Sequence, residues 1–389
     1  MSQRQALWTK DFVLICLTSL FMFTSFYFLI TTLPMYVTDV LKGNESNVGY
    51  IVGVLTITAV LVRPISGYLL DTMGRKSVVV FALVAFVLVT IAYNLATSLL
   101  ILFLLRAIHG FSWGFTSTGA GTIASDIVPA ARRGEGMGYY GLAGTLAMAV
   151  GPVLSIYILG LYGFNTLFTA GSIIAALSLA CLLGIKGSEV KTDKKNTKIS
   201  LNSFLEPRVY SLSMVLFFVN LTYGAIVSFI TLYAKELNIA NAGIFFMVYG
   251  VALLFVRPYA GKIFDKHGPN QIMLIGFISL AASFIVLSIA TGSFMFILSA
   301  IIMGIGFGII QPTLQAMAIN RVEPYRRGAA NGTIFTALDL GIGIGSILLG
   351  LVSNQFGLSY LYLICGFILI IPMVVFFTKD AKKPSNQLG

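Results

Sequence analysis

A few ionisable side chains stand inside long apolar stretches of the chain, where a charge is costly. Asp339 is the one carboxylate placed deep in such a stretch, and its counterpart in the internal repeat described below is Thr145. A charge at the centre of a bilayer costs about 2.5–3.5 kcal/mol on insertion scales, so such a group normally faces protein or water and has a role. Because the repeat does not require an acid there, Asp339 is the first candidate for a group that carries a proton.

Arg63 is the basic residue that we expect beside Asp339. It lies eight residues before Asp71, or about 12 Å along a helix, and Asp339 lies about 15 Å into its own helix. If the two helices dock near their charged ends, these groups lie at similar depth, and the sequence predicts an Arg63–Asp339 pair that protonation of the acid would loosen. The alternative is that Arg63 bonds backbone carbonyls while Asp339 is satisfied within its own half of the chain.

Arg106 and His109 are three positions apart and therefore share one face of a helix. Arg106 has two candidate functions, to tune the proton site or to bind an anionic group of a substrate; the alternative is that it bonds backbone carbonyls. Imidazole titrates near neutrality, which suits proton coupling, although a packing role for His109 is an open alternative. Arg257, which also lies in an apolar stretch, has no acidic partner in the sequence and is expected to be structural.

The elements that hold these residues must lie in lipid. Of the 389 residues, 57% are hydrophobic and only 10% are charged, and the mean hydropathy is +0.92. A soluble domain needs roughly a quarter of its residues charged. The net charge of +11 gives no reason to expect a nucleic-acid partner, because no exposed domain is present to carry a basic surface. The three cysteines stand in apolar stretches without metal-ligand spacing, so neither disulfides nor a metal site is expected.

Twelve apolar stretches are long enough to cross a bilayer, which requires about 20 residues per helix. They lie at residues 12–35, 49–70, 77–97, 99–124, 137–160, 164–185, 209–233, 242–264, 271–290, 293–319, 330–352 and 358–378. Placing both ends of the chain inside leaves Lys42 and Lys235 as the only basic residues of the outer loops, which agrees with the cytoplasmic bias of Lys and Arg. We therefore expect an all-α, twelve-helix protein of the cell membrane with both termini in the cytoplasm.

An internal repeat at an offset of 194 residues divides the chain into two similar halves. The corresponding positions are Arg63-Pro64 and Arg257-Pro258, Gly67 and Gly261, Asp71 and Asp265, Gly74 and Gly268, Gly110 and Gly304, Gly114 and Gly308, Arg132-Arg133-Gly134 and Arg326-Arg327-Gly328, Gly138 and Gly332, and Gly151 and Gly345. An even number of spans separates the copies, so the halves have the same orientation. This is a known plan for transporters, with the substrate bound between the halves near the midplane.

The repeat predicts two pseudo-symmetric six-helix bundles, at residues 1–186 and 209–389, the second ending in a short cytoplasmic tail. Between them, residues 187–208 carry four lysines, one arginine and three acids and are interpreted as a solvated cytoplasmic linker, with a regulatory element as the alternative.

These motifs resemble those of the major facilitator superfamily, over essentially the whole chain. The run Gly67-x3-Asp71-x2-Gly74-Arg75-Lys76 is similar to the signature loop of that family, with Thr72 where a basic residue is usual. Arg106-Ala-Ile-His109-Gly110 resembles the buried-arginine motif of proton-coupled members. The run Gly141-x2-Gly144-x6-Gly151-Pro152 resembles the motif of antiporters, and the likeness is closest to the twelve-helix drug:proton antiporters.

The signature loop also makes physical sense by itself, as a cytoplasmic gate. Gly67 lets another helix approach, and Asp71 can meet the positive amino end of the helix that begins near residue 330. Basic residues are expected to close a charge network around Asp71, and the second copy keeps its acid but has Pro269-Asn270 in place of the basic pair. The alternative is that these charges only fix topology. The predicted gate residues are Gly67, Asp71, Gly74, Arg75, Lys76, Arg133 and Asp265.

Two further groups complete the predicted site. Gly141, Gly144, Gly151 and Pro152 are expected to let their helix bend and pack closely on the helix of residues 242–264, whether the role is packing or motion. Aromatic and amide side chains are candidates for a substrate cavity that suits an amphipathic or apolar solute. These are Phe26, Tyr27, Thr31, Trp113, Asn220, Tyr223, Gln311 and Gln315, each of which has packing as its alternative role.

The leading hypothesis is a monomeric, proton-coupled secondary transporter that exports a small organic molecule by alternating access. An importer or symporter of a sugar or organic ion on the same fold is the alternative. A membrane enzyme or receptor is disfavoured because the sequence has no nucleotide-binding loop, nucleophile–base arrangement, metal cluster or output domain, and no cofactor is expected.

Overall fold

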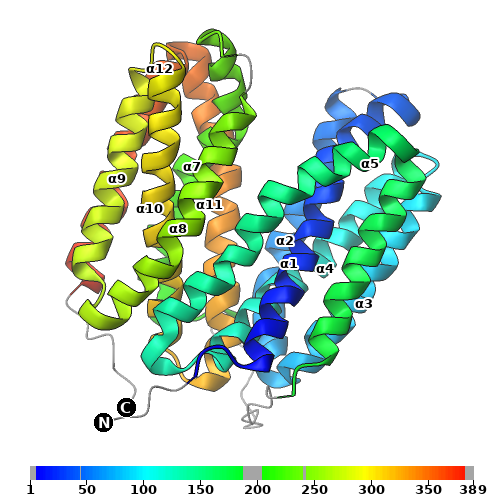
Figure 1. Ribbon diagram of the computed structural model, residues 1–389, viewed down its shortest axis with the longest axis horizontal. Coiled ribbons are helices and arrows are strands. Elements are labelled where there is room, and N and C mark those ends of the chain that lie inside the picture. The colour runs from blue at the N-terminus through cyan, green and yellow to red at the C-terminus, as the bar shows by residue number, and fades with distance from the viewer. Residues whose placement is uncertain (1–5, 44, 187–203, 240–241, 382–389) are drawn as a thin grey trace. The chain divides into compact units, whose positions relative to one another are not determined.

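A computed structural model of the chain describes residues 6–43, 45–186, 204–239 and 242–381, and these residues form helices and short connections without any strand (Figure 1). The predicted all-α class is therefore confirmed. Most of the predicted linker, residues 187–203, and residues 382–389 of the predicted tail lie outside the described residues.

The helices follow the apolar stretches of the sequence, and several of them end beside a glycine or a charged residue. Those of the first half are α1 (Lys10–Met35), α2 (Glu45–Thr72), α3 (Arg75–Ala92), α4 (Leu99–Ile127) and α5 (Arg133–Leu183). Those of the second half are α7 (Tyr210–Glu236), α8 (Gly243–His267), α9 (Asn270–Ser288), α10 (Ser293–Asn320), α11 (Arg327–Phe356), α12 (Leu358–Ile368) and α13 (Ile370–Val375). The hydroxyls of Thr9 and Ser98 cap α1 and α4 by accepting the amides of Phe12 and Ile101.

Eleven helical runs of the described residues are long and apolar enough to cross a membrane, one fewer than the twelve expected. The difference has a local cause. Residues 133–183 form a single element of 51 residues, but Gly163 inside it has φ 76° and ψ −178°, which is not helical. The ribbon of α5 reverses direction there, and the expected stretches 137–160 and 164–185 lie before and after the kink (Figure 1).

The positive-φ glycines follow the internal repeat. Four glycines of the described residues have positive φ, namely Gly74, Gly163, Gly268 and Gly357. They form two pairs at the 194-residue offset, so both halves turn at corresponding points. Gly163 and Gly357, which correspond in the repeat, also have similar ψ angles, −178° and 170°.

The described residues form two compact units that do not coincide with the two halves of the sequence. The first unit comprises Met1–Pro129, Ala143–Leu205 and Pro324–Gly332. The second comprises Ala130–Leu142, Glu206–Glu323 and Thr333–Gly389. The first unit is thus the first half of the chain without the first turns of α5 and with the first turns of α11. The second unit is the second half without the first turns of α11 and with the first turns of α5.

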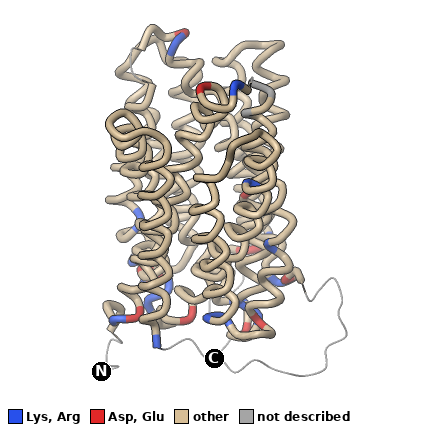
Figure 2. Tube along the Cα trace, turned by 90° about the vertical axis from the view of Figure 1, so that its right-hand side faces the viewer, with Lys and Arg blue, Asp and Glu red and all other residues tan. Residues whose placement is uncertain are grey.

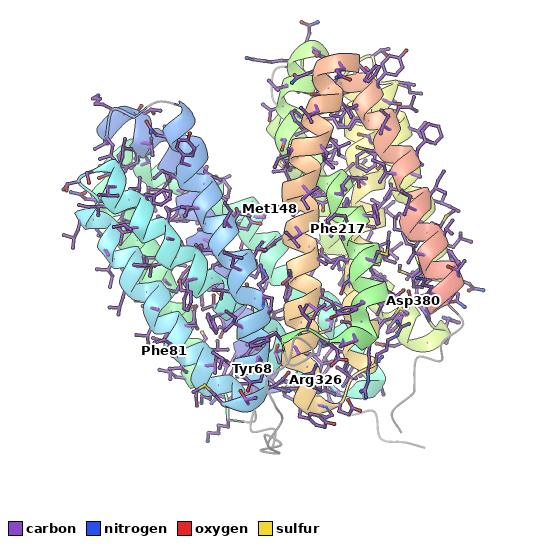
Figure 3. The ribbon with its side chains drawn as sticks, turned by 180° about the vertical axis from the view of Figure 1, so that it is seen from behind. Tyr68, Phe81, Met148, Phe217, Arg326 and Asp380 are labelled. Carbon is purple, nitrogen blue, oxygen red and sulfur yellow. The ribbon has the colours of Figure 1, made fainter. Side chains whose placement is uncertain are left out.

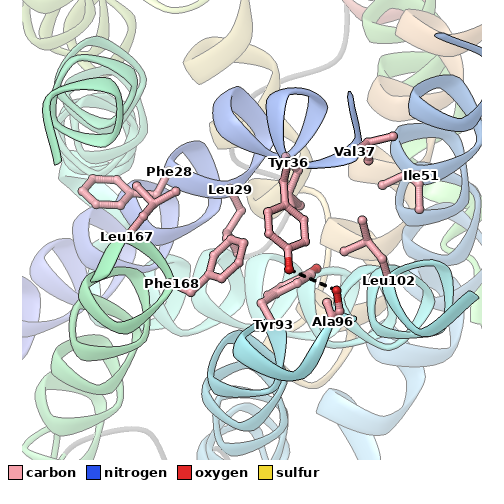
Figure 4. Close-up of a cluster of buried hydrophobic side chains, with 11 residues drawn as sticks. Phe28, Leu29, Tyr36, Val37, Ile51, Tyr93, Ala96, Leu102, Leu167 and Phe168 are labelled. Carbon is pink, nitrogen blue, oxygen red and sulfur yellow. Dashed lines mark hydrogen bonds between the residues drawn. The ribbon is translucent and has the colours of Figure 1, made fainter. Parts of the chain in front are cut away.

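Within each unit the central helices pack through small residues. A Cβ added to Gly114 would lie 2.9 Å from the carbonyl oxygen of Ala59, so α2 and α4 are in close backbone contact. Gly304 does the same in the second unit, where its added Cβ would lie 2.9 Å from the carbonyl oxygen of Tyr249. In the first unit, Tyr36 enters an apolar cluster with Phe168 and donates its hydroxyl to the carbonyl of Ala96 at 3.1 Å (Figure 4).

The outer surface of the helices is apolar, as lipid requires. Phe81 is 73% exposed and Phe294 is 79% exposed, and Figure 3 shows Phe81 standing out from α3. Charged residues lie mostly near the helix ends, with long uncharged segments between them (Figure 2). An exposed apolar surface of this extent is compatible with a bilayer and not with water.

The two kink glycines provide a test of the fold. At Gly163 and Gly357 an added Cβ would meet nothing within 4 Å, so any cost of a larger residue comes from the backbone alone. Backbone of this kind is essentially restricted to glycine, and we expect Gly163→Ala and Gly357→Ala each to cost about 1–3 kcal/mol. The measurement is the apparent unfolding temperature of the detergent-purified protein, with Gly160→Ala, which also has open space, as control. A Gly160→Ala loss equal to that of Gly163→Ala would contradict the assignment.

Candidate functional site

Asp71, at the carboxyl end of α2, caps the amino end of α11. Its two carboxylate oxygens accept the backbone N–H groups of Gly328 and Ala329, both at 2.8 Å. The first N–H groups of a helix have no partner within the helix and carry a partial positive charge, so an aspartate is a favourable cap. The contact expected from the sequence between Asp71 and this helix end is therefore present, and it lies wholly within the first unit.

Glycines make this contact possible. A Cβ added to Gly67 would lie 2.7 Å from the carbonyl oxygen of Gly328 and 2.9 Å from the Cα of Ala329. Further along, a Cβ on Gly332 would lie 2.7 Å from the carbonyl oxygen of Arg63. Since the obstructing atoms are backbone atoms that a rotamer change cannot move, α2 and the start of α11 approach as closely as they do only because both carry glycine.

Asp71 is one of four charged side chains that form a buried cluster. Arg75 pairs with Asp71 at 3.5 Å and with Asp126 at the end of α4, and it also donates to the carbonyl of Pro324. Arg327, in the first turn of α11, pairs with Asp126 at 2.7 Å. Two carboxylates and two guanidinium groups thus neutralise one another where little water reaches them, which is the condition under which buried charges are tolerated.

Two of the residues predicted for this network lie elsewhere. Lys76 donates to the carbonyls of Leu183, at 3.0 Å, and Ile185, at 2.6 Å, and so holds the end of α5. Arg133 belongs to the second unit, where it donates to Asn320. The physical reason is that Asp71 docks on α11, so the basic residue next to its network comes from the first turn of that helix and not from α5.

The second unit contains the equivalent cap, and the charges beside it are more exposed. Asp265, near the end of α8, accepts the N–H groups of Gly134 at 2.8 Å and Glu135 at 2.9 Å, at the start of α5. Pro269 replaces the arginine that follows the first cap, and Asn320 stands where the first copy has Asp126. Glu135, which pairs with Arg132 at 2.7 Å and Lys262 at 3.7 Å, has no acidic counterpart in the first copy.

Arg63 and Asp339 lie in different units, and their pairing remains a prediction. Arg63 is buried and donates to the hydroxyls of Ser117, at 3.1 Å, and Thr118, at 3.2 Å, on α4. Asp339 is partly buried in α11. Arg257, the repeat counterpart of Arg63, is likewise buried and donates to the amide oxygen of Gln311 at 2.8 Å and to the carbonyl of Gly141.

Arg106 and His109 lie together in α4 and are both fully buried. Arg106 Nε donates to the carbonyl of Ile51 on α2 at 3.2 Å. His109 Nδ1 is 2.9 Å from the hydroxyl of Tyr93, which was not among the residues predicted from the sequence. The two terminal nitrogens of Arg106 and Nε2 of His109 are buried without a hydrogen-bond partner.

The glycines of the antiporter-like motif divide between the two units. A Cβ on Gly141 would meet the guanidinium of Arg257 on α8, 2.6 Å away, as the predicted packing on that helix requires. Gly144 and Gly151 instead face α1, where added Cβ atoms would lie 3.9 Å from Phe23 and 2.8 Å from Tyr27. The expectation that all of them contact α8 is therefore wrong, because α5 passes from the second unit into the first after Leu142. Pro152 lies inside the helical stretch that precedes the kink.

The candidate cavity residues form two clusters, one in each unit. In the first, Phe26 stacks on Trp113 with ring centroids 4.0 Å apart, next to Tyr27, whose backbone carbonyl accepts the Thr31 hydroxyl at 2.9 Å.

In the second unit, Tyr223 packs edge-on against Phe307, and Asn220 donates to the carbonyl of Leu216 at 2.8 Å. Gln311 holds Arg257, whereas the amide nitrogen of Gln315 is buried without a partner. These contacts make Gln311 and Asn220 partly structural.

Several residues of the site were missed from the sequence. Asp126, Arg327 and Tyr93 have chemistry-bearing side chains, but only folding brings them to their partners. A signal was available for Asp126, because its repeat counterpart is Asn320, a near-isosteric polar residue at the same helix end. Within the described residues, no group of three or more His, Cys, Asp or Glu side chains is placed to hold a metal ion.

Comparisons with known proteins find a matching family model and several similar transporters. The family model described as Major Facilitator Superfamily matches residues 15–273 and 212–389. The chain is 26% identical over 365 residues to the staphylopine export protein of Staphylococcus aureus, covering 90% of this chain and 91% of that protein. It is also 26% identical to an uncharacterized MFS-type transporter of Escherichia coli, YhhS, covering 92% of this chain and 89% of that protein.

Solved structures share the fold. The human organic anion transporter MFSD10 superposes with a TM-score of 0.83 at 15% identity and covers 94% of this chain and 98% of its own. The proton:xylose symporter XylE superposes with a TM-score of 0.77 at 15% identity and covers 97% of this chain and 96% of its own. At this level of identity the likeness concerns the fold alone.

The glycine contact beneath the Asp71 cap can be tested locally. We expect Gly67→Ala to push α2 away from the first turn of α11 and to expose the amides that Asp71 accepts, at a cost of about 1–3 kcal/mol. Hydrogen–deuterium exchange should therefore speed up several-fold in a peptide that covers residues 327–332. Gly53→Ala, in the same helix and with nothing within 4 Å of its added Cβ, is the matched control. Unchanged exchange in Gly67→Ala would show that α2 and the first turn of α11 are not in close backbone contact.

Proposed function

The chain belongs to the Major Facilitator Superfamily, and on that premise we propose that it is a proton-coupled secondary transporter that exports a small organic molecule by alternating access. We further propose that it crosses the cell membrane twelve times, counting the two stretches of α5 separately, as a monomer with both ends in the cytoplasm. Small-molecule transport across a membrane follows from the family. Export, proton coupling and topology are the proposed part.

The observation that carries the proposal is the pair of equivalent caps, Asp71 on the start of α11 and Asp265 on the start of α5. Each cap holds a helix at the point where the chain passes from one unit to the other. Its bonds are few, charge-assisted and confined to helix ends. A contact of this kind is suited to form in one orientation of the halves and to break in the other, as alternating access requires.

Proton coupling is assigned to Asp339, with Arg63 as the basic group that stabilises its charged form. Asp339 stands in an apolar helix at a position where the repeat has Thr145, so the fold does not require an acid there. Protonation would remove a charge from the low-dielectric interior and change which orientation is favoured. Arg106 and His109 are the other ionisable groups deep in the first unit.

The direction of transport is proposed from two features. A staphylopine export protein is 26% identical over nearly the whole chain, and the Gly141–Pro152 motif resembles that of antiporters. The competing function is uptake of a sugar or organic ion with protons, which has a structural neighbour in a proton:xylose symporter. The aromatic cluster around Phe26 and Trp113 favours an amphipathic solute over a sugar.

Transport by reconstituted protein tests the proposal. In inside-out proteoliposomes with an acidic interior, we expect proton-driven uptake of at least one member of a solute panel that contains organic cations, neutral aromatics, aromatic carboxylates and sugars. Asp339→Asn should lower this uptake by about tenfold or more, because the amide cannot release a proton. It should retain solute exchange without a proton gradient, which shows that the variant is folded and binds.

Asp339→Glu and Asp39→Asn are the controls. The first keeps a carboxyl at this position of α11, and the second removes a carboxyl from the short helical segment Tyr36–Val40 after α1, outside the proposed site. Uptake by Asp339→Asn at the wild-type rate would remove Asp339 from the coupling mechanism. Uptake that occurs only from the face opposite to the one proposed would favour the importer.

A further inference from the structure

Arg106 is a buried cation that the described residues leave unneutralised. Its side chain is 0% exposed, Nε donates to the carbonyl of Ile51, and neither terminal nitrogen makes a well-formed hydrogen bond with the described residues, although the Tyr93 hydroxyl lies close to the guanidinium. Arg106 forms no ion pair with the described residues. A guanidinium in this situation costs several kcal/mol, a cost that the fold normally removes by pairing. By contrast, Arg63 and Arg257 bond side chains of α4 and α10.

His109 supplies a second donor beside it. Tyr93 lies close to the guanidinium, without a well-formed bond to either terminal nitrogen, and its hydroxyl is 2.9 Å from His109 Nδ1. A phenol oxygen next to a cation turns its lone pairs toward that cation and its proton away. The Tyr93 proton is therefore donated to Nδ1, which places the imidazole proton on Nε2. That N–H is buried and has no partner.

The repeat shows that the fold does not need these polar groups. The positions that correspond to Tyr93, Arg106 and His109 in the second half are Leu287, Ala300 and Met303. All three are fully buried and apolar. The same place in the same helical arrangement is thus filled by ordinary packing in one copy and by three polar side chains in the other, so a structural requirement does not explain them.

Aromatic rings flank the unpartnered donors. Phe86 lies edge-on to the His109 ring at 4.8 Å, and Phe26, which stacks on Trp113, lies 6.2 Å from it. All belong to α1, α3 and α4 of the first unit. A planar fork of guanidinium donors matches a carboxylate, and aromatic faces match an apolar body.

From this arrangement we propose that Arg106 and His109, oriented by Tyr93, bind the carboxylate of an amphipathic, aromatic-bearing solute. The inference rests on the proposed transport function and names its substrate class: an organic carboxylate, with the anionic group at Arg106 and the ring among Phe26, Trp113 and Phe86. Arg106 and His109 touch the solute, whereas Tyr93 is a positioning residue that fixes the imidazole tautomer.

The test is ligand-induced stabilisation of the full-length protein in detergent, at constant chloride concentration. Benzoate is the probe, and benzamide, which has the same shape without the charge, is its control. Binding to the native state raises the apparent unfolding temperature in a saturable way. We expect benzoate to stabilise the wild type and benzamide to have little effect. Equal stabilisation by the two compounds, or none by either, would overturn the proposal.

Substitutions locate the site. Arg106→Gln should weaken benzoate binding by about tenfold or more, because the charge-assisted fork is lost. Tyr93→Phe keeps the volume and should weaken binding by about threefold, because the imidazole tautomer is no longer fixed. Arg257→Gln, which removes a buried arginine whose bonds are made within the second unit, should bind benzoate as the wild type does. Wild-type affinity in Arg106→Gln would refute the assignment.

Stability separates a binding role from a structural one. With the unpaired charge removed, Arg106→Met without ligand should unfold at the wild-type temperature or above it. A fall of several degrees would show that Arg106 supports the fold and would count against a binding role.

The failure of this proposal can be distinguished from the failure of the proposed function. Benzoate binding without proton-driven transport would leave the site intact and refute the proposed function, whereas Asp339-dependent transport with no benzoate binding would do the reverse.

Discussion

A helix that begins in apolar surroundings leaves its first backbone N–H groups without partners, and the rest of this structure depends on how that need is met. For α5 and α11 the partner is an aspartate from another helix, Asp265 and Asp71. Because a carboxylate reaches those N–H groups only if the helices nearly touch, glycine is required on both sides of each contact. The pattern of glycines and acids in the sequence is the consequence of that single geometric demand.

The two contacts share a geometry and differ in charge. At the first contact, the charges of Asp71, Arg75, Asp126 and Arg327 neutralise one another and have little exposure to water. Around Asp265, the charges that accompany it are those of Glu135, Arg132 and Lys262, and the last is half exposed. Parting the first contact therefore leaves more buried charge without a partner than parting the second. Both halves therefore keep the aspartate cap, whereas the charged residues around it differ.

The three buried arginines that lie well inside the apolar helices, Arg63, Arg106 and Arg257, differ in how their charge is satisfied. Arg63 and Arg257 occupy corresponding positions and bond corresponding ones, Ser117 and Gln311, so the repeat has kept an arginine and a polar partner together. Arg106 has no such arrangement, and Ala300 stands at its counterpart. Two of the three arginines thus belong to the architecture that both halves share. The third belongs to one half only, which is where a specific function is most readily acquired.

The sequence by itself determined the membrane class, the apolar helices, the repeat and the identity of the capping acid, because these depend on composition and on spacing along one chain. It did not determine that Arg133 and Lys76 make contacts other than those with Asp71. Which charges meet is decided by which unit the start of α5 and the start of α11 belong to, and these helix starts contact residues 131 and 257 positions away in the chain. Tyr93 illustrates the same limit: only packing brings its hydroxyl to His109, and only burial leaves the neighbouring guanidinium unneutralised.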